Sequence, residues 1–271
     1  MERGADRGAE SDPGAPYEHS LPGHVDDRGT AYIGAPPRRV VSLVPSLTEA
    51  IAATDPGLLV GATGWCTHPP GLDVTRVGGT RWPDLDRVRG LGPDLVVANA
   101  EENRDEDVAA LRAAGIPVWV TAPATVDEAL TSLDRLCVVL DRPEPAWLRG
   151  VHDVWAAPPR VPSATAVVPI WRRPWMVLGR DTFAGDVLAR LGVRNVFGDH
   201  ADRYPRLAKD DPSAVTADLV VFPDEPYAFT ADDGPEAWPQ CRPVFVSGRH
   251  LTWYGPSLAE APAVLTAQLT G

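Results

Sequence analysis

The sequence lacks the features that mark several common classes of protein. No stretch approaches the ~20 consecutive apolar residues of a transmembrane helix, so no membrane insertion is expected. Only three cysteines occur, Cys66, Cys137 and Cys241, and their odd number and wide spacing favour free thiols in a reducing compartment over a disulfide framework. Positive charge is also scarce, since 25 Lys and Arg stand against 37 Asp and Glu for a net charge of −12. This balance disfavours partners such as nucleic acids or anionic membranes.

The common motifs of catalysis are missing as well. The chain contains no Gly-x-Gly-x-x-Gly fingerprint, no phosphate-binding loop, no His-Glu-x-x-His and no Gly-x-Ser-x-Gly. A nucleophile pair made of Cys66 and His68 is sterically poor, because residues two apart in one loop must fold back to meet. We therefore expect no enzyme activity and no catalytic cofactor, with a cytosolic enzyme as the minor alternative.

Residues 1–37 differ in composition from the rest of the chain. They mix Gly, Asp, Glu, Arg, Pro and His with almost no apolar pattern, which predicts a disordered N-terminal tail. No apolar segment follows Met1 and no lipid-attachment motif is present, so the sequence as it stands predicts a cytoplasmic protein. An extracytoplasmic location is the alternative if the true start lies elsewhere.

One pattern occurs twice in the remaining chain. Short apolar runs bounded by breakers predict strands that are buried on both faces of a parallel sheet. The helical spacing of Val108 and Leu111 between the first two runs predicts a strand–helix–strand unit. The first copy is Asp94-Leu-Val-Val-Ala-Asn-Ala-Glu-Glu102 with Gly115-Ile-Pro-Val-Trp-Val-Thr121, and the second is Asp218-Leu-Val-Val-Phe-Pro-Asp-Glu225 with Cys241-Arg-Pro-Val-Phe-Val-Ser247.

The repeat indicates an α/β fold of two Rossmann-like lobes with parallel sheets. We assign residues 38–140 to the N-terminal lobe, 141–160 to a connecting helix and 161–271 to the C-terminal lobe. Ligands of open parallel sheets bind beyond the carboxyl ends of the strands, so Glu101 and Glu225 would face each other across a cleft between the lobes. Near the start of the first lobe, Ser46 and Glu49 have the spacing of a helix capping box.

Five segments in order resemble class III substrate-binding proteins, which serve ABC transporters for cobalamin, haem and iron siderophores. The resemblance covers roughly residues 38–270 and is nearest to the helical backbone metal receptor group. It implies two lobes joined by a long rigid backbone helix, here Pro145 to Ala156, with the ligand between them and an ABC permease as partner. The matching segments are Arg39-Val-Val-Ser-Leu-Val-Pro-Ser-Leu-Thr-Glu49, Gly61-Ala-Thr-Gly-Trp-Cys-Thr-His-Pro-Pro70, Val77-Gly-Gly-Thr80, Leu91-Gly-Pro-Asp-Leu-Val-Val97 and Asp181-Thr-Phe-Ala-Gly-Asp186.

The chain departs from the better-known relatives in two respects. Those proteins are exported and often lipid-anchored, and neither feature is present here. Their aromatic cage is kept only in part: Trp65 replaces a Tyr, and Thr80 and Asn99 fall where cobalamin binders place Trp. Trp82, two residues after Thr80, is a candidate substitute.

A flat, apolar ligand surface is expected where tryptophans gather in loops at the strand ends. These are Trp65, Trp82, Trp171, Trp175 and Trp253, and their faces suit a macrocycle or a cationic ligand. Packing between the lobes is the structural alternative for each. We predict non-catalytic binding of a metal chelate or corrinoid in this cleft, by Trp65, Thr80, Trp82, Asn99, Glu101, Trp171, Arg172, Glu225, Arg249 and Trp253.

A bare transition-metal ion is the alternative ligand. Cys66 and His68 flank Thr67 in one loop, and carboxylates could complete a mixed donor set. Cys66 fits better as a small buried hydrophobe, which leaves His68, Glu101, Glu225 and His250 as candidate metal ligands. The resemblance also implies that acids on each lobe dock arginines of a permease, and Glu49 and Asp186 hold matching helix starts for that task.

Overall fold

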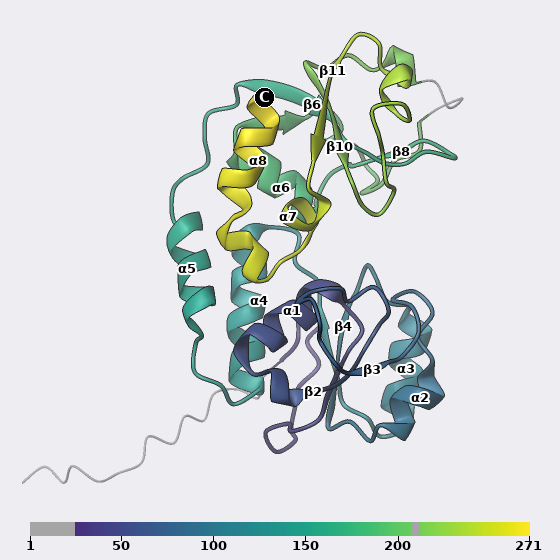
Figure 1. Ribbon diagram of the computed structural model, residues 1–271, viewed down its shortest axis with the longest axis vertical. Coiled ribbons are helices and arrows are strands. Elements are labelled where there is room, and N and C mark those ends of the chain that lie inside the picture. The colour runs from purple at the N-terminus through teal and green to yellow at the C-terminus, as the bar shows by residue number, and fades with distance from the viewer. Residues whose placement is uncertain (1–24, 208–211) are drawn as a thin grey trace, which may run out of the picture.

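The N-terminal lobe is built on a five-stranded parallel sheet with helices on both faces (Figure 1). The computed structural model describes residues 25–207 and 212–271. Neighbouring side chains on the central strands point to opposite faces, because Val40 and Val97 join one hydrophobic cluster while Val41 and Val96 join another. The strand order is β3-β2-β1-β4-β5. The elements are β1 (Val40–Ser42), α1 (Pro45–Thr54), β2 (Leu59–Ala62), β3 (Thr75–Arg76), α2 (Leu85–Gly90), β4 (Leu95–Asn99), α3 (Asp105–Ala113) and β5 (Val118–Thr121).

The C-terminal lobe repeats this plan with a four-stranded parallel sheet in the order β11-β10-β6-β9. A small antiparallel hairpin, β7–β8, leaves the end of β6. The strands are β6 (Ala164–Val167), β7 (Pro169–Trp171), β8 (Met176–Val177), β9 (Val193–Asn195), β10 (Leu219–Pro223) and β11 (Arg242–Val246), and the helices are α6 (Phe183–Arg190), α7 (Gly248–Thr252) and α8 (Ala261–Thr270). Short 3₁₀ turns are Pro56–Leu58, Pro212–Ala214, Pro235–Ala237 and Pro256–Ala259.

The sequence repeat corresponds to equivalent strand pairs in the two lobes. β4 and β5 pair in parallel, and so do β10 and β11. The two units differ in the segment that connects their strands. The first crosses over through α3, whereas the described structure between β10 and β11 includes only the 3₁₀ turn Pro235–Ala237. The prediction of two related α/β lobes is therefore confirmed.

Two helices, rather than one, connect the lobes. They are α4 (Val126–Val139) and α5 (Ala146–Trp155), which stand side by side in Figure 1. At one end of α5, the Trp147 indole donates to Thr54 Oγ1 of the N-terminal lobe at 3.1 Å. At its other end, the Trp155 indole donates to the carbonyl of Leu258 in the C-terminal lobe at 2.9 Å. Residues 126–140, assigned to the N-terminal lobe from the sequence, contact both lobes: the backbone N–H of Val126 bonds Asp186 of the C-terminal lobe, and Arg135 pairs with Asp27.

The connector shares one hydrophobic core with both lobes. A continuous cluster runs from Leu47 in α1, through Leu133 and Leu148 of the connector, to Val187 and Leu265 in the C-terminal lobe. The side chains of these five residues are at most 1 % exposed. Separating a lobe from the connector would expose this apolar surface to water, at about 25 cal/mol per Å². The helical hairpin is therefore the rigid part of the junction.

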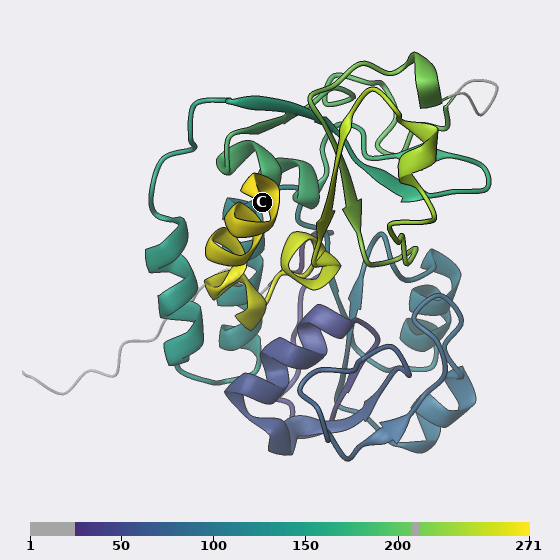
Figure 2. The same cartoon turned by 45° about the horizontal axis from the view of Figure 1, so that its top comes forward.

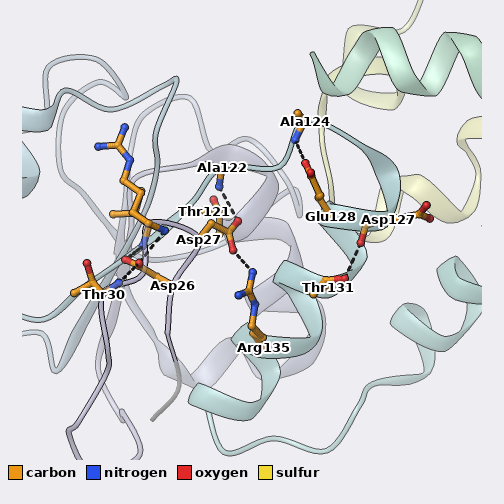
Figure 3. Close-up of polar contacts among 12 residues, drawn as sticks. Asp26, Asp27, Thr30, Thr121, Ala122, Ala124, Asp127, Glu128, Thr131 and Arg135 are labelled. Atoms are coloured by element: carbon orange, nitrogen blue, oxygen red, sulfur yellow. Dashed lines mark hydrogen bonds and ion pairs between the residues drawn. The ribbon is translucent and has the colours of Figure 1, made fainter. Parts of the chain in front are cut away.

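The residues that precede the first strand are ordered from Val25 onward, which corrects the prediction of a tail to residue 37. The carboxylate of Asp26 is 2 % exposed and accepts from the backbone N–H groups of Thr30 and Val120. Asp27 accepts from the N–H of Ala122 and pairs with Arg135 of α4 (Figure 3). These bonds fix the segment along the edge strand β5. The first 24 residues of the predicted tail lie outside the described residues.

Within the described part of the chain, no helix combines the length and the apolar character that crossing a bilayer requires.

Candidate functional site

The carboxyl ends of the two sheets face each other, as Figure 2 shows from a tilted view. The loops after β2, β3 and β4 come from the N-terminal lobe, and those after β9, β10 and β11 come from the C-terminal lobe. Several side chains of these loops bond one another directly across the junction. The structure therefore shows the lobes in contact, with side chains of both lobes meeting where the cleft was predicted.

Glu101, a predicted ligand contact, is engaged by the opposite lobe. Its carboxylate pairs with the guanidinium of Arg203 and accepts a hydrogen bond from the hydroxyl of Tyr204. Burial and the charge of Glu101 raise the pKa of Tyr204, so this phenol stays a donor at neutral pH. We name this group of three the Glu101 clasp. Neither Arg203 nor Tyr204 was predicted as a site residue, because neither belongs to the repeat or to a recognised motif.

Glu49 forms a second bridge between the lobes, with Arg249. The predicted capping box is therefore wrong. The helix α1 begins two residues earlier than expected, at Pro45, a residue suited to the first helical position. Its N-cap is Val44, which has no side chain that can cap. Glu49 thus lies a turn into the helix, where its side chain reaches Arg249 of α7.

Asn99 lies beneath the site rather than in it. Its side chain is 5 % exposed, and its oxygen accepts from the backbone N–H groups of Glu101 and Glu102 at 2.8 and 3.2 Å. Its amide nitrogen donates to the hydroxyl of Tyr254, from the other lobe, at 2.7 Å. Tyr254 also bonds Thr121, at 2.7 Å. The structure assigns Asn99 to shaping the acidic loop and joining the lobes, in place of the predicted ligand contact.

Three carboxylates meet at the junction. Burial, together with the neighbouring charges of Glu225 and Glu101, raises the pKa of Glu102 to about 8. Burial raises the pKa of Glu225 as well, although hydrogen bonds from Trp253 and Thr252 oppose this. The Glu102 carboxyl has no hydrogen-bond or ion-pair partner among the described residues. Of Glu101, Glu102 and Glu225, Glu102 is the one acid that no donor among the described residues stabilises.

Three of the predicted tryptophans expose their rings. Trp65 and Trp82 of the N-terminal lobe are 70 % and 67 % exposed, and Trp171 of the C-terminal lobe is 43 % exposed. The guanidinium carbon of Arg104 lies 3.9 Å from the centre of the Trp82 ring, which fixes the orientation of that ring. The indole nitrogen of Trp65 lies beside Gly79, in the loop that also carries Trp82. Two large exposed aromatic rings therefore lie in neighbouring loops of the N-terminal lobe.

The other two tryptophans are buried. Trp175 is 7 % exposed and packs against Phe229 and Trp238 in a core of the C-terminal lobe, so a ligand contact there was wrong. Trp253 is 8 % exposed and meets the edge of the His68 ring, with 5.4 Å between ring centres. That contact joins the two lobes.

Arg172 and Thr80 have partners within their own lobes. Arg172 forms ion pairs with Asp233 and Glu236 and lies over the Trp175 ring. The Thr80 hydroxyl lies 3.4 Å from that of Thr63, and its carbonyl accepts from Asn103. Both are therefore less available to a ligand than the sequence suggested.

The predicted metal ligands do not converge. Among the described residues, the one set of three side chains close enough to hold an ion is Asp134, Glu144 and His152, which lies outside the cleft. His250 bonds Ser247 and faces Glu260. His68 bonds Thr67, and burial with the nearby Arg249 lowers its pKa.

Cys66 behaves as the small buried hydrophobe that the sequence favoured. It is 1 % exposed, its sulfur bonds Thr48 and Thr63, and burial raises its pKa. The acid proposed for permease docking on the second lobe, Asp186, is likewise engaged, by Arg190.

Comparisons with known proteins agree with this architecture. Residues 40–236 match the family model described as periplasmic binding protein. The vitamin B12-binding protein of Pectobacterium carotovorum subsp. carotovorum is 24 % identical over 248 residues, which cover 86 % of this chain and 89 % of that protein.

Two solved structures share the fold. The periplasmic vitamin B12 binding protein BtuF of Vibrio cholerae aligns with a TM-score of 0.67 and 19 % identity, covering 87 % of this chain and 97 % of that one. The periplasmic heme-binding protein RhuT of Roseiflexus sp. RS-1 aligns with a TM-score of 0.66 and 23 % identity, covering 85 % and 97 %.

Proposed function

The chain belongs to the periplasmic binding protein family, and we propose that it binds a metal-chelating macrocycle, a corrinoid or a haem, between its two lobes. The observation that carries the proposal is the exposure of Trp65 and Trp82 in loops after strands of the N-terminal lobe, together with the exposed Trp171 of the C-terminal lobe. Large exposed indole rings are costly on a surface without a ligand and offer broad apolar contact to a flat one. Relatives whose names specify vitamin B12 or heme support the same ligand class.

Binding requires the contacts between the lobes to exchange partners. The Glu101 clasp and the Glu49–Arg249 pair close the junction. A ligand that enters must replace these partners with its own amides or carboxylates. Arg203 and Arg249 then serve as donors to acidic or carbonyl groups of the ligand, and Glu101 serves as an acceptor for amide N–H groups. Neutral His68 at the same junction is the side chain suited to an axial bond to the chelated metal.

The family context extends the proposal to a transport partner. In it, the closed, ligand-loaded protein presents both lobes to an ABC permease, without chemical change of the ligand. Because Glu49 and Asp186 are held by arginines of this chain, docking at these acids would require those pairs to open. The cytoplasmic location predicted from the sequence stays a prediction, and cell fractionation tests it.

Tryptophan fluorescence of the purified chain, titrated with aquocobalamin, haem and a ferric siderophore, tests the binding proposal. We expect saturable quenching by one macrocycle, corrected for inner-filter absorption. Trp65→Ala and Trp82→Ala should each weaken the affinity about tenfold or more, because each removes a broad apolar contact. The matched control is Trp147→Phe in the connector, which should change the total emission but not the affinity. Saturation by none of the three ligands would contradict the proposal.

Unchanged recovery of the ligand distinguishes binding from catalysis. After saturation, the ligand is released by denaturation and its absorption spectrum and mass are compared with the starting material. The binding proposal predicts identical spectra and masses. A modified ligand that accumulates with time would favour the alternative of an enzyme on this fold.

A further inference from the structure

A separate group of metal-binding side chains lies on the connector, outside the cleft. It comprises Asp134 of α4, Glu144 of the loop between the helices, and His152 of α5. Their nearest ligand atoms all lie within 4.8 Å of one another, and His152 Nε2 is 3.0 Å from Asp134 Oδ1. Atoms bound to one metal at 2.0–2.2 Å are at most about 4.4 Å apart. A small side-chain adjustment would therefore bring all three into bonding distance of one ion.

The surroundings of the group favour a cation. Cys137, one turn after Asp134 on α4, is 6 % exposed and has no hydrogen-bond partner among the described residues. Cys137 and Trp147 line the same small cavity, so this face of α4 is the one turned to α5. Burial and the charges of Asp134 and Glu144 raise the pKa of Cys137 to about 11. Arg149 lies 3.5 Å from the Glu144 carboxylate, and its side chain is mostly exposed.

We infer that Asp134, Glu144 and His152 form a binding site for a borderline divalent transition-metal ion such as Zn²⁺ or Ni²⁺. One imidazole nitrogen with two carboxylate oxygens favours these ions over Ca²⁺ and Mg²⁺, which take oxygen ligands alone. Three protein ligands leave further coordination positions to water. This inference is independent of the macrocycle proposed for the cleft.

A metal held here would link the two connecting helices. Asp134 and His152 sit on different helices, and Glu144 sits in the loop that reverses the chain. An ion that binds all three would oppose separation of α4 from α5. Because both helices contact both lobes, the expected consequence is a stiffer and more stable junction.

Isothermal titration of the full chain, without a histidine tag or cleft ligand, tests the inference with ZnCl₂ and NiCl₂. We expect one equivalent to bind, and a rise of about 5–10 °C in Tm at a hundredfold excess over Kd. Asp134→Asn and His152→Ala should each weaken binding at least about tenfold. Asp153 is an exposed acid on α5, next to His152 in sequence but outside the group. The control variant Asp153→Asn should therefore leave binding unchanged.

Two results would overturn the inference. One is the absence of saturable binding of either ion to the wild type. The other is binding that His68→Ala abolishes while His152→Ala does not change it, because the metal would then lie in the cleft. Circular dichroism of each variant, with its Tm in the presence of a chelator, shows that a loss of binding is not a loss of folding.

Discussion

The two lobes meet in two places, and the two contacts are built from different interactions. In the connector, apolar side chains such as Leu133 and Leu148 are completely buried, and the indoles of Trp147 and Trp155 bond one lobe each. In the cleft, the Arg203–Glu101 ion pair stays partly exposed to water, whereas Glu49 and the Asn99–Tyr254 bond are buried polar contacts. Apolar burial is lost at a large cost, whereas partly exposed ion pairs exchange partners cheaply. The comparison indicates one permanent junction and one junction that opens.

The largest effect is expected in the connector. Leu148→Ala removes a side chain that is 0 % exposed and leaves a cavity between α5 and both lobes. We expect the free energy of unfolding to fall by about 2–5 kcal/mol, measured by urea denaturation. The matched control is Val154→Ala on the same helix, whose side chain is 42 % exposed and should cost less than about 0.5 kcal/mol. Equal losses in the two variants would show that the connector is not the core of the junction.

A smaller, pH-dependent effect is expected at Glu102. Its pKa is raised from about 4.5 to about 8 in the folded protein, so the folded state holds a proton that the unfolded chain releases. Stability therefore falls as the pH rises from about 4.5 to 8, where this carboxyl must ionise beside Glu101 and Glu225. Glu102→Gln removes this penalty and should stabilise the protein by about 1–3 kcal/mol above pH 8 and negligibly near pH 4.

Thermal unfolding between pH 4 and pH 9 measures this difference. Glu106→Gln, at an exposed acid on α3, is the matched control and should follow the wild type at every pH. Parallel curves for Glu102→Gln and the wild type would contradict the placement of an unpaired acid at the junction.

The smallest effect is expected for the Glu101 clasp. The side chains of Arg203 and Glu101 are 40 % and 31 % exposed, so solvent screens their attraction. A double-mutant cycle with Glu101→Gln and Arg203→Gln should give a coupling of about 0.5–1 kcal/mol in unfolding free energy. A coupling as large as the cost of Leu148→Ala would mean that the cleft is as permanent as the connector.

Features with a local sequence signal were predicted well. The repeated apolar runs of β4, β5, β10 and β11 became paired parallel strands, because burial on both faces of a sheet is visible in consecutive residues. The exposed rings of Trp65 and Trp82 follow from their positions after strands. The burial of Cys66 was also predicted, because a free cysteine behaves as a small apolar residue.

Features that depend on how the lobes face each other were not predictable. The partners of Glu101 and Glu49 are about 100 and 200 residues away in sequence, and no pattern along the chain encodes those pairs. The buried bond of Asn99 to Tyr254 was unpredictable for a related reason, because it depends on the docked lobes.

The order in residues 25–37 also escaped composition-based reasoning. Composition counts apolar residues, whereas Asp26 and Asp27 fix this segment through carboxylates that accept backbone N–H bonds at the strand β5 and pair with arginines (Figure 3). A polar segment can thus become ordered when it satisfies the exposed edge of a sheet.

A cross-link across the cleft tests most directly whether this junction must open. In the double variant Glu101→Cys/Arg203→Cys, a reducible bismaleimide joins the two new thiols. The native cysteines are buried, so they should not react. The wild type, treated in the same way, is the control. Aquocobalamin and haem are then titrated before and after reduction. The account predicts that the ligand bound by the reduced protein fails to bind the linked protein, and that reduction restores binding. Equal affinity in the linked and reduced forms would contradict it.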